Sequence, residues 1–338
     1  MARVALDEVV NVVSRAFERA GLRADKARTC ARVHAESSRD GVYSHGLNRV
    51  PRFVDYLERG WVVADAEPAQ VRAVGPIEVW DGGRGPGILN ALAATDRAMD
   101  LAADHGIGIV ALRNTTHWMR GGAFGWRAAE AGRIAIAWTN TEACMPAWGG
   151  VDCRLGNNPF VIAVPRDEGP VVLDMAMSQY SYGKLQVTRL KGERLPYPGG
   201  FDSDGGLTDD PGAIEKSMRI LPTGFWKGSG LAIMLDLVAA ILSEGLATYG
   251  IDEIQRGSCT GCSQVFIVLD PDRLGSAAHM REVVDGVVAY VNASAPVKSG
   301  RKVTVPGQNT LATREDHAAN GVVVEDEIWA EVRRLADV

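Results

Sequence analysis

A histidine and an arginine four residues apart, His45 and Arg49, form the pair best suited to chemistry in this sequence. Asp40-Gly41 before them is typical of a turn, and the residues after Gly46 are expected to begin a helix. On one helical face, an imidazole that exchanges protons near neutral pH would lie beside a permanent cation. Such a pair can reduce a keto acid, because the cation binds the carboxylate and the imidazole supplies a proton. Taken alone, however, the pair also fits a turn-capping histidine beside a solvent-exposed arginine.

Further motifs strengthen the catalytic interpretation. Beside Tyr43-Ser44-His45-Gly46 with Arg49, they are Arg113-Asn114-Thr115-Thr116-His117-Trp118, Gly156-Asn157-Asn158-Pro159 and Trp226-Lys227-Gly228-Ser229-Gly230. With these motifs the chain resembles the type 2 malate/L-lactate dehydrogenase family, from its first helix to about Trp329. The resemblance implies an α/β protein with a non-Rossmann, mixed-sheet NAD(P)-binding domain. It also implies a homodimer whose active sites lie near the subunit interface.

The resemblance assigns roles to individual residues. His45 would protonate the carbonyl oxygen of a keto acid while nicotinamide delivers hydride, and Arg49 would bind the carboxylate. Ser44 and His117 would orient the substrate or its hydroxyl groups. The cofactor contacts map onto Val172, Asp174, Met175 and Ala176, then Trp226 and Lys227, then Gly307, Gln308 and Asn309. Asp174 would contact a ribose or nicotinamide group, or else hold a histidine in one tautomer.

The last cofactor segment departs from the family pattern. Other members usually have Glu after Pro-Gly, whereas this chain has Pro306-Gly307-Gln308-Asn309. The neutral amides lack the charge of that carboxylate, which leaves both the cofactor preference and the exact substrate open. We expect NADH to be preferred, because Gln308 and Asn309 offer hydrogen bonds to a ribose hydroxyl but no cation for a 2′-phosphate. NADPH is the alternative.

The nearest match to a dinucleotide-binding fingerprint, Gly106-Ile107-Gly108, stands in the wrong order. It follows an Ala-rich helix expected from Leu89 to Asp104 and opens a strand expected from Ile107 to Leu112. The Rossmann fingerprint instead follows a strand and opens a helix. No Rossmann site is therefore expected.

The glycine-rich segment from Gly224 to Gly230 leads directly into a helix expected from Leu231 to Ser243. Free backbone N–H groups, the helix dipole and Lys227 would together favour a phosphate there. A glycine-rich helix start with a lysine in solvent is the alternative interpretation.

Composition indicates a soluble, cytoplasmic enzyme. Among 338 residues, 46% are hydrophobic, and a net charge of −6 offers no footprint for nucleic acid or anionic lipid. Five cysteines, an odd count, favour free thiols in a reducing compartment. Cys259 and Cys262 have C-x-x-C spacing without a second pair, so no metal is expected. Leu231 to Leu242, interrupted by Asp236, is expected to be far too short to span a bilayer.

Hydrophobic periodicity predicts a helical opening segment, and the family resemblance implies how the rest of the chain is divided. Residues 1–75 are expected to form a helical segment with the catalytic histidine, and 76–270 a central NAD(P)-binding and sheet region. Residues 271–338 would form helices that return to the N-terminal lobe. Arg194 to Glu215, rich in Gly, Pro and Asp, is expected to be a long surface excursion that acts as a lid or an oligomer contact.

These observations predict an NAD(P)H-dependent reductase or dehydrogenase of a 2-keto acid. Malate, lactate, ureidoglycolate or a cyclic-imine carboxylate are alternative substrates within the family. A catalytically silent, ligand-binding dimer is a further alternative. Retention of Ser44, His45, Arg49, His117 and Lys227 argues against it, since a silent protein has no physical need for all of them.

Overall fold

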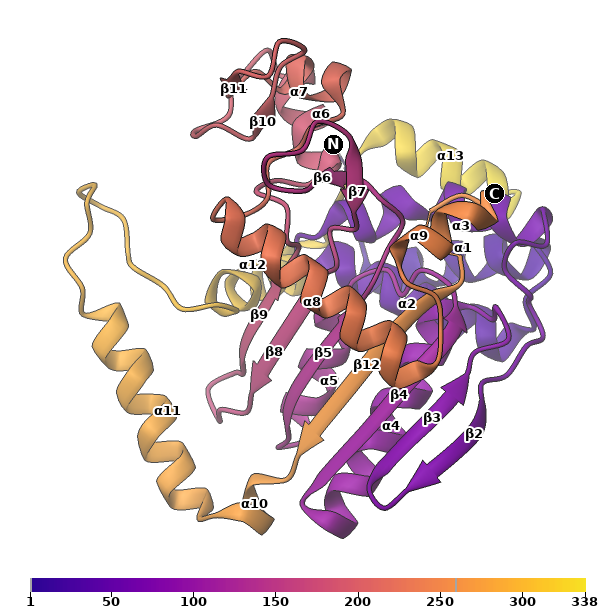
Figure 1. Cartoon of the computed structure of the whole chain (residues 1–338), viewed down its shortest axis with the longest axis vertical. Helices are drawn as coiled ribbons and strands as arrows, with labels where there is room; N and C mark the ends of the chain where they lie inside the picture. The colour runs from indigo at the N-terminus through magenta and orange to yellow at the C-terminus, as the bar shows by residue number, and fades with distance from the viewer. Residues whose placement is uncertain (1, 259) are drawn as a thin grey trace.

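A mixed seven-stranded sheet forms the centre of the computed structural model, which describes residues 2–258 and 260–338 (Figure 1). In spatial order its strands are β2 (Ala69–Val74), β3 (Ile77–Asp81), β4 (Ile107–Thr115), β12 (Cys262–Leu269), β5 (Ile134–Thr139), β8 (Phe160–Val164) and β9 (Val171–Met175). Among the described strands of this sheet, β3 and β4 form the one parallel pair, and the other neighbours are antiparallel. A Rossmann sheet is mostly parallel, so the prediction of a non-Rossmann α/β fold is confirmed.

Helices cover both faces of this sheet. α4 (Gly87–His105) and α5 (Gly122–Glu130) pack on one face, and α8 (Trp226–Ser243) crosses the other (Figure 1). Side chains alternate along a strand, so Phe266 of β12 lies in the core beneath α4 and α5, whereas Val265 lies in the core beneath α8. Two separate apolar layers therefore hold the sheet in place.

The two ends of the chain share a third apolar core. It joins α1 (Leu6–Arg19), α2 (Ala24–Arg39), α3 (Val50–Glu58) and α13 (Asp326–Ala336). Next to it, β1 (Ala2–Val4) pairs with β13 (Val322–Val324) in an antiparallel ribbon. The apolar stripes that predicted the first three helices face this core, including fully buried Cys30.

The segment after residue 270 does not all return to this lobe. It contains α10 (Pro271–Leu274), α11 (Ala277–Asn292) and α12 (Gln308–Asn320) before β13. Figure 1 shows α11 projecting away from the body, and Val288 is the buried residue of that helix. The proposed boundaries at residues 75 and 270 stay predictions.

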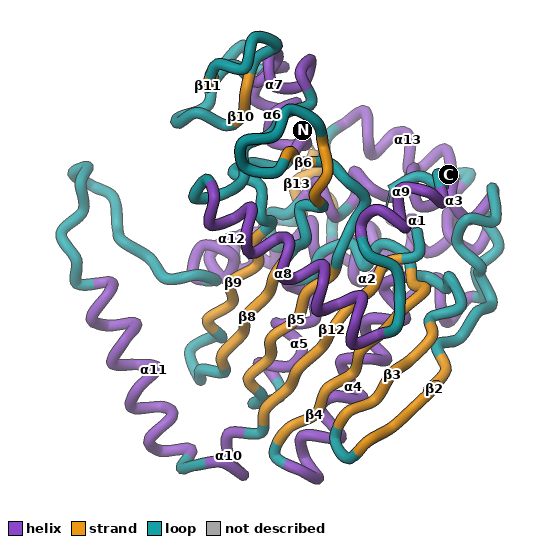
Figure 2. The backbone as a smooth tube through the Cα atoms, viewed as in Figure 1, coloured by secondary structure: helices purple, strands orange, loops and turns teal. Residues whose placement is uncertain are grey.

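The surface excursion from Arg194 to Glu215 has more structure than its composition predicted. It forms a hairpin of β10 (Gly200–Phe201) and β11 (Leu207–Thr208), followed by α7 (Pro211–Ser217), which packs on α6 (Tyr182–Leu190) (Figure 2). Its apolar residues form a small core with α6 that includes Leu185, Leu195 and Ile214. Beside it lies a second ribbon, β6 (Met145–Pro146) with β7 (Cys153–Leu155), and α9 (Thr248–Ile254) follows α8.

The helix expected from Leu231 begins earlier, at Trp226, and the prediction that it is far too short to span a bilayer was wrong about its length. Its 18 residues have a mean hydropathy of 1.4, enough by length and composition alone to cross a membrane, and 33% of them are buried. A core helix of a globular protein passes the same test, so this is weak evidence. Asp236 within it accepts hydrogen bonds from Asn140 Nδ2 (2.8 Å) and Thr248 N (3.0 Å).

Asp40, expected in a turn, is a buried junction between distant parts of the chain. Its carboxylate accepts hydrogen bonds from Arg39 Nε (2.9 Å), Arg120 Nη1 (2.6 Å) and Arg314 Nη2 (2.8 Å). Burial alone would raise the pKa of Asp40, but these guanidinium groups hold it below its usual range. The N-terminal lobe, the central sheet region and α12 therefore meet at one carboxylate.

Replacing this carboxylate should destabilise the whole fold. Asp40→Asn keeps the shape but leaves Arg120, 5% exposed, with only the more distant carboxylate of Asp174, 3.6 Å from its Nε; loss of a buried ion-pair partner typically costs about 3–5 kcal/mol. Urea unfolding at neutral pH measures the loss. The control Asp96→Asn removes a surface partner of Arg127 and should cost less than about 1 kcal/mol. Equal losses in the two variants would contradict a junction at Asp40.

The same ion network predicts how the stability of the fold depends on pH. Because the pKa of Asp40 is lowered in the folded state, its contribution is fully present above the unfolded value of about 3.9 and is lost as pH falls through the lower folded value. Asp40→Asn should lack this part of the acid dependence.

Candidate active site

His45 and Arg49 lie on two successive 3-10 turns, not on one α-helix. η1 spans Tyr43–His45, η2 spans Leu47–Arg49, and α3 begins only after them. A helix does begin after Gly46, as the 3-10 turn η2 that runs into α3, but Gly46, with φ −106° and ψ −125°, separates it from the turn that carries His45. The prediction that His45 and Arg49 share one helical face was therefore wrong. Both side chains nevertheless line the same cavity, so the turn geometry brings them together.

Side chains of helix α2 hold this turn in place. The Oγ of Ser38 accepts the N–H of Leu47 at 2.9 Å, and Nδ1 of His34 lies 3.0 Å from the carbonyl oxygen of Gly46. Burial lowers the pKa of His34 to about 4, so the imidazole is neutral and its Nδ1 proton is donated to that carbonyl. A Cβ on Gly46 would lie 2.1 Å from Ser38 Oγ, so only glycine fits here.

A cavity of about 770 Å³ opens beside this turn. All four predicted catalytic residues, Ser44, His45, Arg49 and His117, line it. Its remaining walls come from the strand ends, α6 and β13, and include Thr139, Glu142, Asn157, Lys184, Ser258 and Val323. The structure therefore brings the predicted catalytic residues together around one space large enough for a small substrate.

His45 is neutral in this environment. Its Nδ1 lies 2.9 Å from Ser44 Oγ, and its ring centroid lies 5.8 Å from that of His117. Burial, followed by the charges of Arg49 and Arg120, lowers the pKa of His45 to about 3. The imidazole can therefore accept a proton near neutral pH without first losing one.

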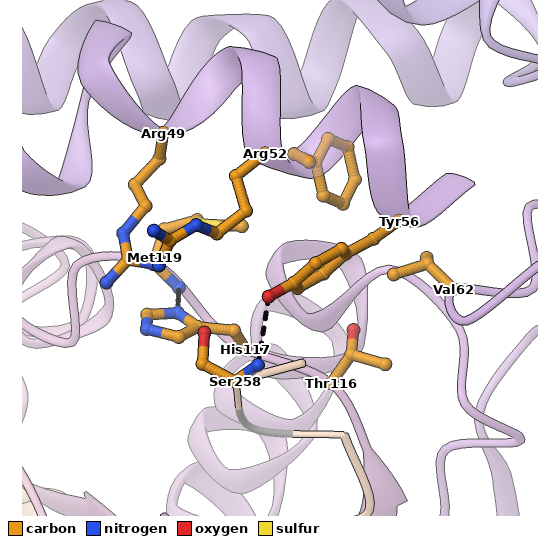
Figure 3. Close-up of a pocket in the computed structure, with 9 residues that line it drawn as sticks. Arg49, Arg52, Tyr56, Val62, Thr116, His117, Met119 and Ser258 are labelled. Atoms are coloured by element: carbon orange, nitrogen blue, oxygen red, sulfur yellow. Dashed lines mark hydrogen bonds between the residues drawn. The ribbon is translucent and has the colours of Figure 1, made fainter. Parts of the chain in front are cut away.

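His117 is held in one tautomer by its own backbone. Its Nδ1 accepts the N–H of Met119 at 2.8 Å, so the ring proton lies on Nε2 (Figure 3). Burial and the charge of Arg49 hold the pKa of His117 well below its usual range. A neutral Nε2–H donor therefore lies in the cavity wall beside His45.

The rest of the motif around His117 is structural. Arg113 Nε and Asn114 Nδ2 both donate to Asp81, at 3.1 and 2.9 Å, and Thr116 Oγ1 donates to the carbonyl oxygen of Gly85 at 2.8 Å. Within this motif, His117 and Trp118 are the residues that line the 770 Å³ cavity.

Sequence analysis missed Arg52, a second cation of the cavity. Arg52 lines the cavity together with Arg49 and His117. In Figure 3 its side chain extends from α3 toward Arg49. The sequence could have indicated this residue, because Arg52 follows Arg49 by three positions and residues three apart share a helix face.

The predicted cofactor residues gather elsewhere, around β9. Val172 N donates to the carbonyl oxygen of Pro306 at 3.2 Å, which places Gly307 beside this strand. Thr223 N donates to Met177 O at 2.8 Å, which brings the loop before Trp226 beside the chain that follows Ala176. None of the nine predicted cofactor residues, all within the described part of the chain, lines the 770 Å³ cavity.

Asp174 contacts an arginine, not a histidine. Its Oδ2 accepts the N–H of Gly122 at 3.0 Å and lies 3.6 Å from Arg120 Nε. Burial raises the pKa of Asp174, against the opposing charge of Arg120. Because Arg120 also binds Asp40, this carboxylate is linked to the junction at the start of the catalytic turn.

Two details of the cofactor prediction need correction. Gly228 N donates to Thr223 O at 2.9 Å and Lys227 N to Gly224 O at 3.3 Å, so the backbone N–H groups expected to be free for a phosphate are already bonded. The side-chain oxygen of Gln308 accepts the N–H of Val305 at 2.8 Å and is likewise committed. The Nζ of Lys227 and the exposed amide of Asn309 remain as ligand groups.

Among residues 2–258 and 260–338, no group of three His, Cys, Asp or Glu side chains is arranged to hold a metal ion. Cys262 is buried at the start of β12, whereas Cys259 lies outside the described residues.

Comparison with known proteins identifies the chemistry that this site serves. A sequence model described as malate/L-lactate dehydrogenase matches residues 4–333. The chain belongs to this family. The resemblance inferred from the motifs is therefore confirmed.

Relatives and solved structures agree with this assignment. The 2,3-diketo-L-gulonate reductase of Citrobacter koseri is 42% identical over 334 residues, covering 98% of this chain and 100% of that protein. Delta1-piperideine-2-carboxylate reductase from Pseudomonas syringae pvar. tomato is 28% identical with a TM-score of 0.86, over 99% of this chain and 100% of that chain. Malate dehydrogenase from Entamoeba histolytica, 21% identical, shares the fold with a TM-score of 0.92 over 99% and 97%.

Membership of the malate/L-lactate dehydrogenase family makes this protein an oxidoreductase of hydroxy and keto acids. The family also implies a nicotinamide cofactor. The alternative of a catalytically silent protein loses its support, because the cavity retains all four predicted catalytic side chains.

A substitution at Gly46 tests whether its close contact with α2 positions the catalytic turn. Gly46→Ala places a methyl group against Ser38 and the α2 backbone, which should cost about 1–3 kcal/mol and displace His45 relative to Arg49. A displacement of this kind can lower kcat about 10²-fold. Gly286→Ala, where a Cβ meets nothing within 4 Å, is the matched control; it should leave kcat unchanged and raise stability by up to about 1 kcal/mol, because Ala favours the helix α11 more than Gly does. Normal kcat in Gly46→Ala would show that the close contact between Gly46 and α2 is not required for catalysis.

Proposed function

We propose that this protein reduces a 2-keto acid of the 2,3-diketo-L-gulonate type with NAD(P)H as reductant. The observation that carries the proposal is the convergence of His45, His117 and Arg49 on one cavity. The name and 98% coverage of the Citrobacter koseri relative support this substrate. Malate, lactate, ureidoglycolate or a cyclic-imine carboxylate are the alternatives within the family.

Arg49 binds the carboxylate of the keto acid. A guanidinium offers a planar fork that matches both carboxylate oxygens, which fixes the orientation of the neighbouring carbonyl group. Because Arg49 follows His45 by one 3-10 turn, a carboxylate held by Arg49 places that carbonyl on the side of the cavity where His45 lies.

His45 gives its Nε2 proton to the carbonyl oxygen as the hydroxyl group forms. Ser44 supports this transfer at the other ring nitrogen, 2.9 Å away. The serine hydroxyl rotates, so it accepts from Nδ1–H in the imidazolium and donates to bare Nδ1 when Nε2 carries the proton. His117, with its proton on Nε2, donates a hydrogen bond to a substrate oxygen from its place beside His45.

Substrate binding raises the pKa of the proton donor. In the free enzyme, burial and the charge of Arg49 lower the pKa of His45 to about 3. A substrate carboxylate offsets the charge of Arg49 and adds a negative neighbour, and both changes favour the imidazolium. Binding of a keto acid therefore increases the fraction of His45 that carries a proton.

The residues around β9 fit a nicotinamide dinucleotide. Lys227 supplies a cation for a phosphate, Asn309 an exposed amide for a ribose, and Gly307 a close approach of backbone to β9. When bound, the reduced nicotinamide supplies the hydride that the carbonyl carbon accepts.

A second copy of the chain covers the outer face of α8. Leu231, Met234, Leu237 and Ile241 recur at helical spacing along this face and are 42–70% exposed. An apolar stripe of this extent is typical of a subunit interface. The proposal is therefore a homodimer, with α8 at the contact.

A turnover panel tests the proposed function. Reduction of 2,3-diketo-L-gulonate, pyruvate, oxaloacetate and a cyclic-imine carboxylate is followed at the nicotinamide absorbance with NADH and NADPH. The proposal requires the highest kcat/KM for 2,3-diketo-L-gulonate. A higher value for another acid would replace this substrate and keep the reaction class, whereas no turnover with any of them would reject the function.

The pH dependence of turnover tests the role of His45. With a free-enzyme pKa of about 3, kcat/KM for reduction should fall about tenfold per unit between roughly pH 6 and pH 8, while kcat/KM for oxidation stays flat. His45→Ala should lower turnover ~10²–10⁴-fold and abolish that slope. The control His105→Ala removes an exposed histidine and should change neither. An unchanged slope in His45→Ala would remove His45 from proton transfer.

Cofactor preference tests the assignment of α12. NADH should be preferred by about 1–2 kcal/mol, the value of one charge-assisted contact, because Gln308 and Asn309 carry no charge against a 2′-phosphate. Asn309→Arg should raise kcat/KM for NADPH relative to NADH, whereas Asn320→Arg at the far end of α12 should not. A tenfold preference of the unaltered enzyme for NADPH would contradict this assignment.

A further inference from the structure

Arg52 is a cation of the active-site cavity that the proposed mechanism does not use. It is the third residue of α3, three positions after Arg49, and both line the cavity with His117. Figure 3 shows its side chain extended from the helix toward Arg49. Its guanidinium therefore lies where a substrate bound by Arg49 would extend.

No acidic side chain neutralises this guanidinium among residues 2–258 and 260–338. Arg59, on the same helix, instead donates to Asp55 at 2.7 Å and stacks over Trp61 at 4.9 Å. The charge of Arg52 reaches His117 and helps to lower the pKa of that ring. Two guanidinium groups beside neutral histidines repel each other, and an acceptor-rich ligand relieves that repulsion.

We propose that Arg52 is a specificity-determining residue that binds a second oxygen acceptor of the substrate, next to the carbonyl that is reduced. This inference rests on the proposed function, in which Arg49 holds the carboxylate and His45 faces the reacting carbonyl. Side chains three apart on a helix start about 5–6 Å from each other, a spacing that spans a carboxylate and an oxygen two carbons away. Arg52 would therefore favour 2-keto acids with a further carbonyl at C3 over 2-keto acids with a plain alkyl chain.

Both arginines on a single carboxylate would be a different arrangement with a different consequence. In that case every 2-keto acid would depend on Arg52, whatever its chain carries. The two arrangements can be distinguished by comparing how a change at Arg52 affects two acids that have the same keto-acid group but differ in the rest of the chain.

The experiment compares 2,3-diketo-L-gulonate with 2-ketobutyrate, which lacks the second acceptor. Arg52→Gln should lower kcat/KM for 2,3-diketo-L-gulonate ~10–100-fold, the loss typical of a charge-assisted hydrogen bond, and mainly through KM. The same variant should change kcat/KM for 2-ketobutyrate less than about threefold. Arg52→Lys should recover part of the loss, and the control Arg59→Gln should affect neither acid.

Either of two results would overturn the inference. Equal losses for both acids would place Arg52 on the shared carboxylate, and no loss for either would make it a surface charge.

Binding without turnover keeps this test separate from the proposed function. Titration calorimetry of each acid into the enzyme saturated with the oxidised nicotinamide measures dead-end complexes. The unaltered enzyme should bind 2,3-diketo-L-gulonate more tightly than 2-ketobutyrate, and Arg52→Gln should lose that difference. If the enzyme reduces neither acid yet shows this pattern, the proposed function fails and the role of Arg52 stands. If it reduces both acids without the pattern, only the role of Arg52 fails.

Discussion

The buried carboxylate of Asp40 is the contact on which the arrangement of the active site depends. Asp40 ends α2, five residues before His45, and binds Arg120 and Arg314 from the two other parts of the chain. A buried ion pair adds little stability by itself, because desolvation offsets most of the attraction. Its value lies in orientation, since a carboxylate with several fixed donors permits one relative placement of the segments that carry them. The catalytic turn begins at that point, so the cavity has a defined wall before any ligand enters.

The charges around the cavity follow from the same network. Arg49 and Arg120 are positive neighbours of His45, and both lower the pKa of its ring in addition to burial. Buried cations beside a histidine keep it neutral until an anion arrives. In the proposed mechanism the substrate carboxylate therefore does two things at once: it positions the carbonyl, and it raises the pKa of His45 so that a larger fraction of this residue carries the proton to be donated. A neutral ketone would lack both effects, which explains why an acid group suits this site.

Hydrophobic periodicity predicted the regular elements, because helices and strands follow local patterns that a single sequence carries. The stripe with Phe17, for example, gave α1 and its core face correctly. The 3-10 turns around Gly46 could not be predicted this way, since their shape comes from His34 and Ser38 on another helix. The hydrogen bond from the N–H of Gly228 to the carbonyl oxygen of Thr223 was missed for the same reason, because Thr223 belongs to a loop whose path is set by β9. The pairing of His45 with Arg49 on one cavity was predicted, but by motif resemblance and not by the helical geometry first assumed.

The placement of the two arginines separates the constant part of substrate recognition from the part that can change. Arg49 lies on a turn seated on α2, where even a methyl group on Gly46 would not fit, so the carboxylate contact is fixed by the packing of the lobe. Arg52 lies on a regular helix whose buried residues, Phe53 and Val54, lie on its other side. A change at position 52 leaves the apolar core and the catalytic turn untouched, since neither depends on that side chain. If both arginines act as proposed, the fold holds the keto-acid group in one way while a single exposed helix position selects the rest of the substrate, so that one scaffold can serve several acids.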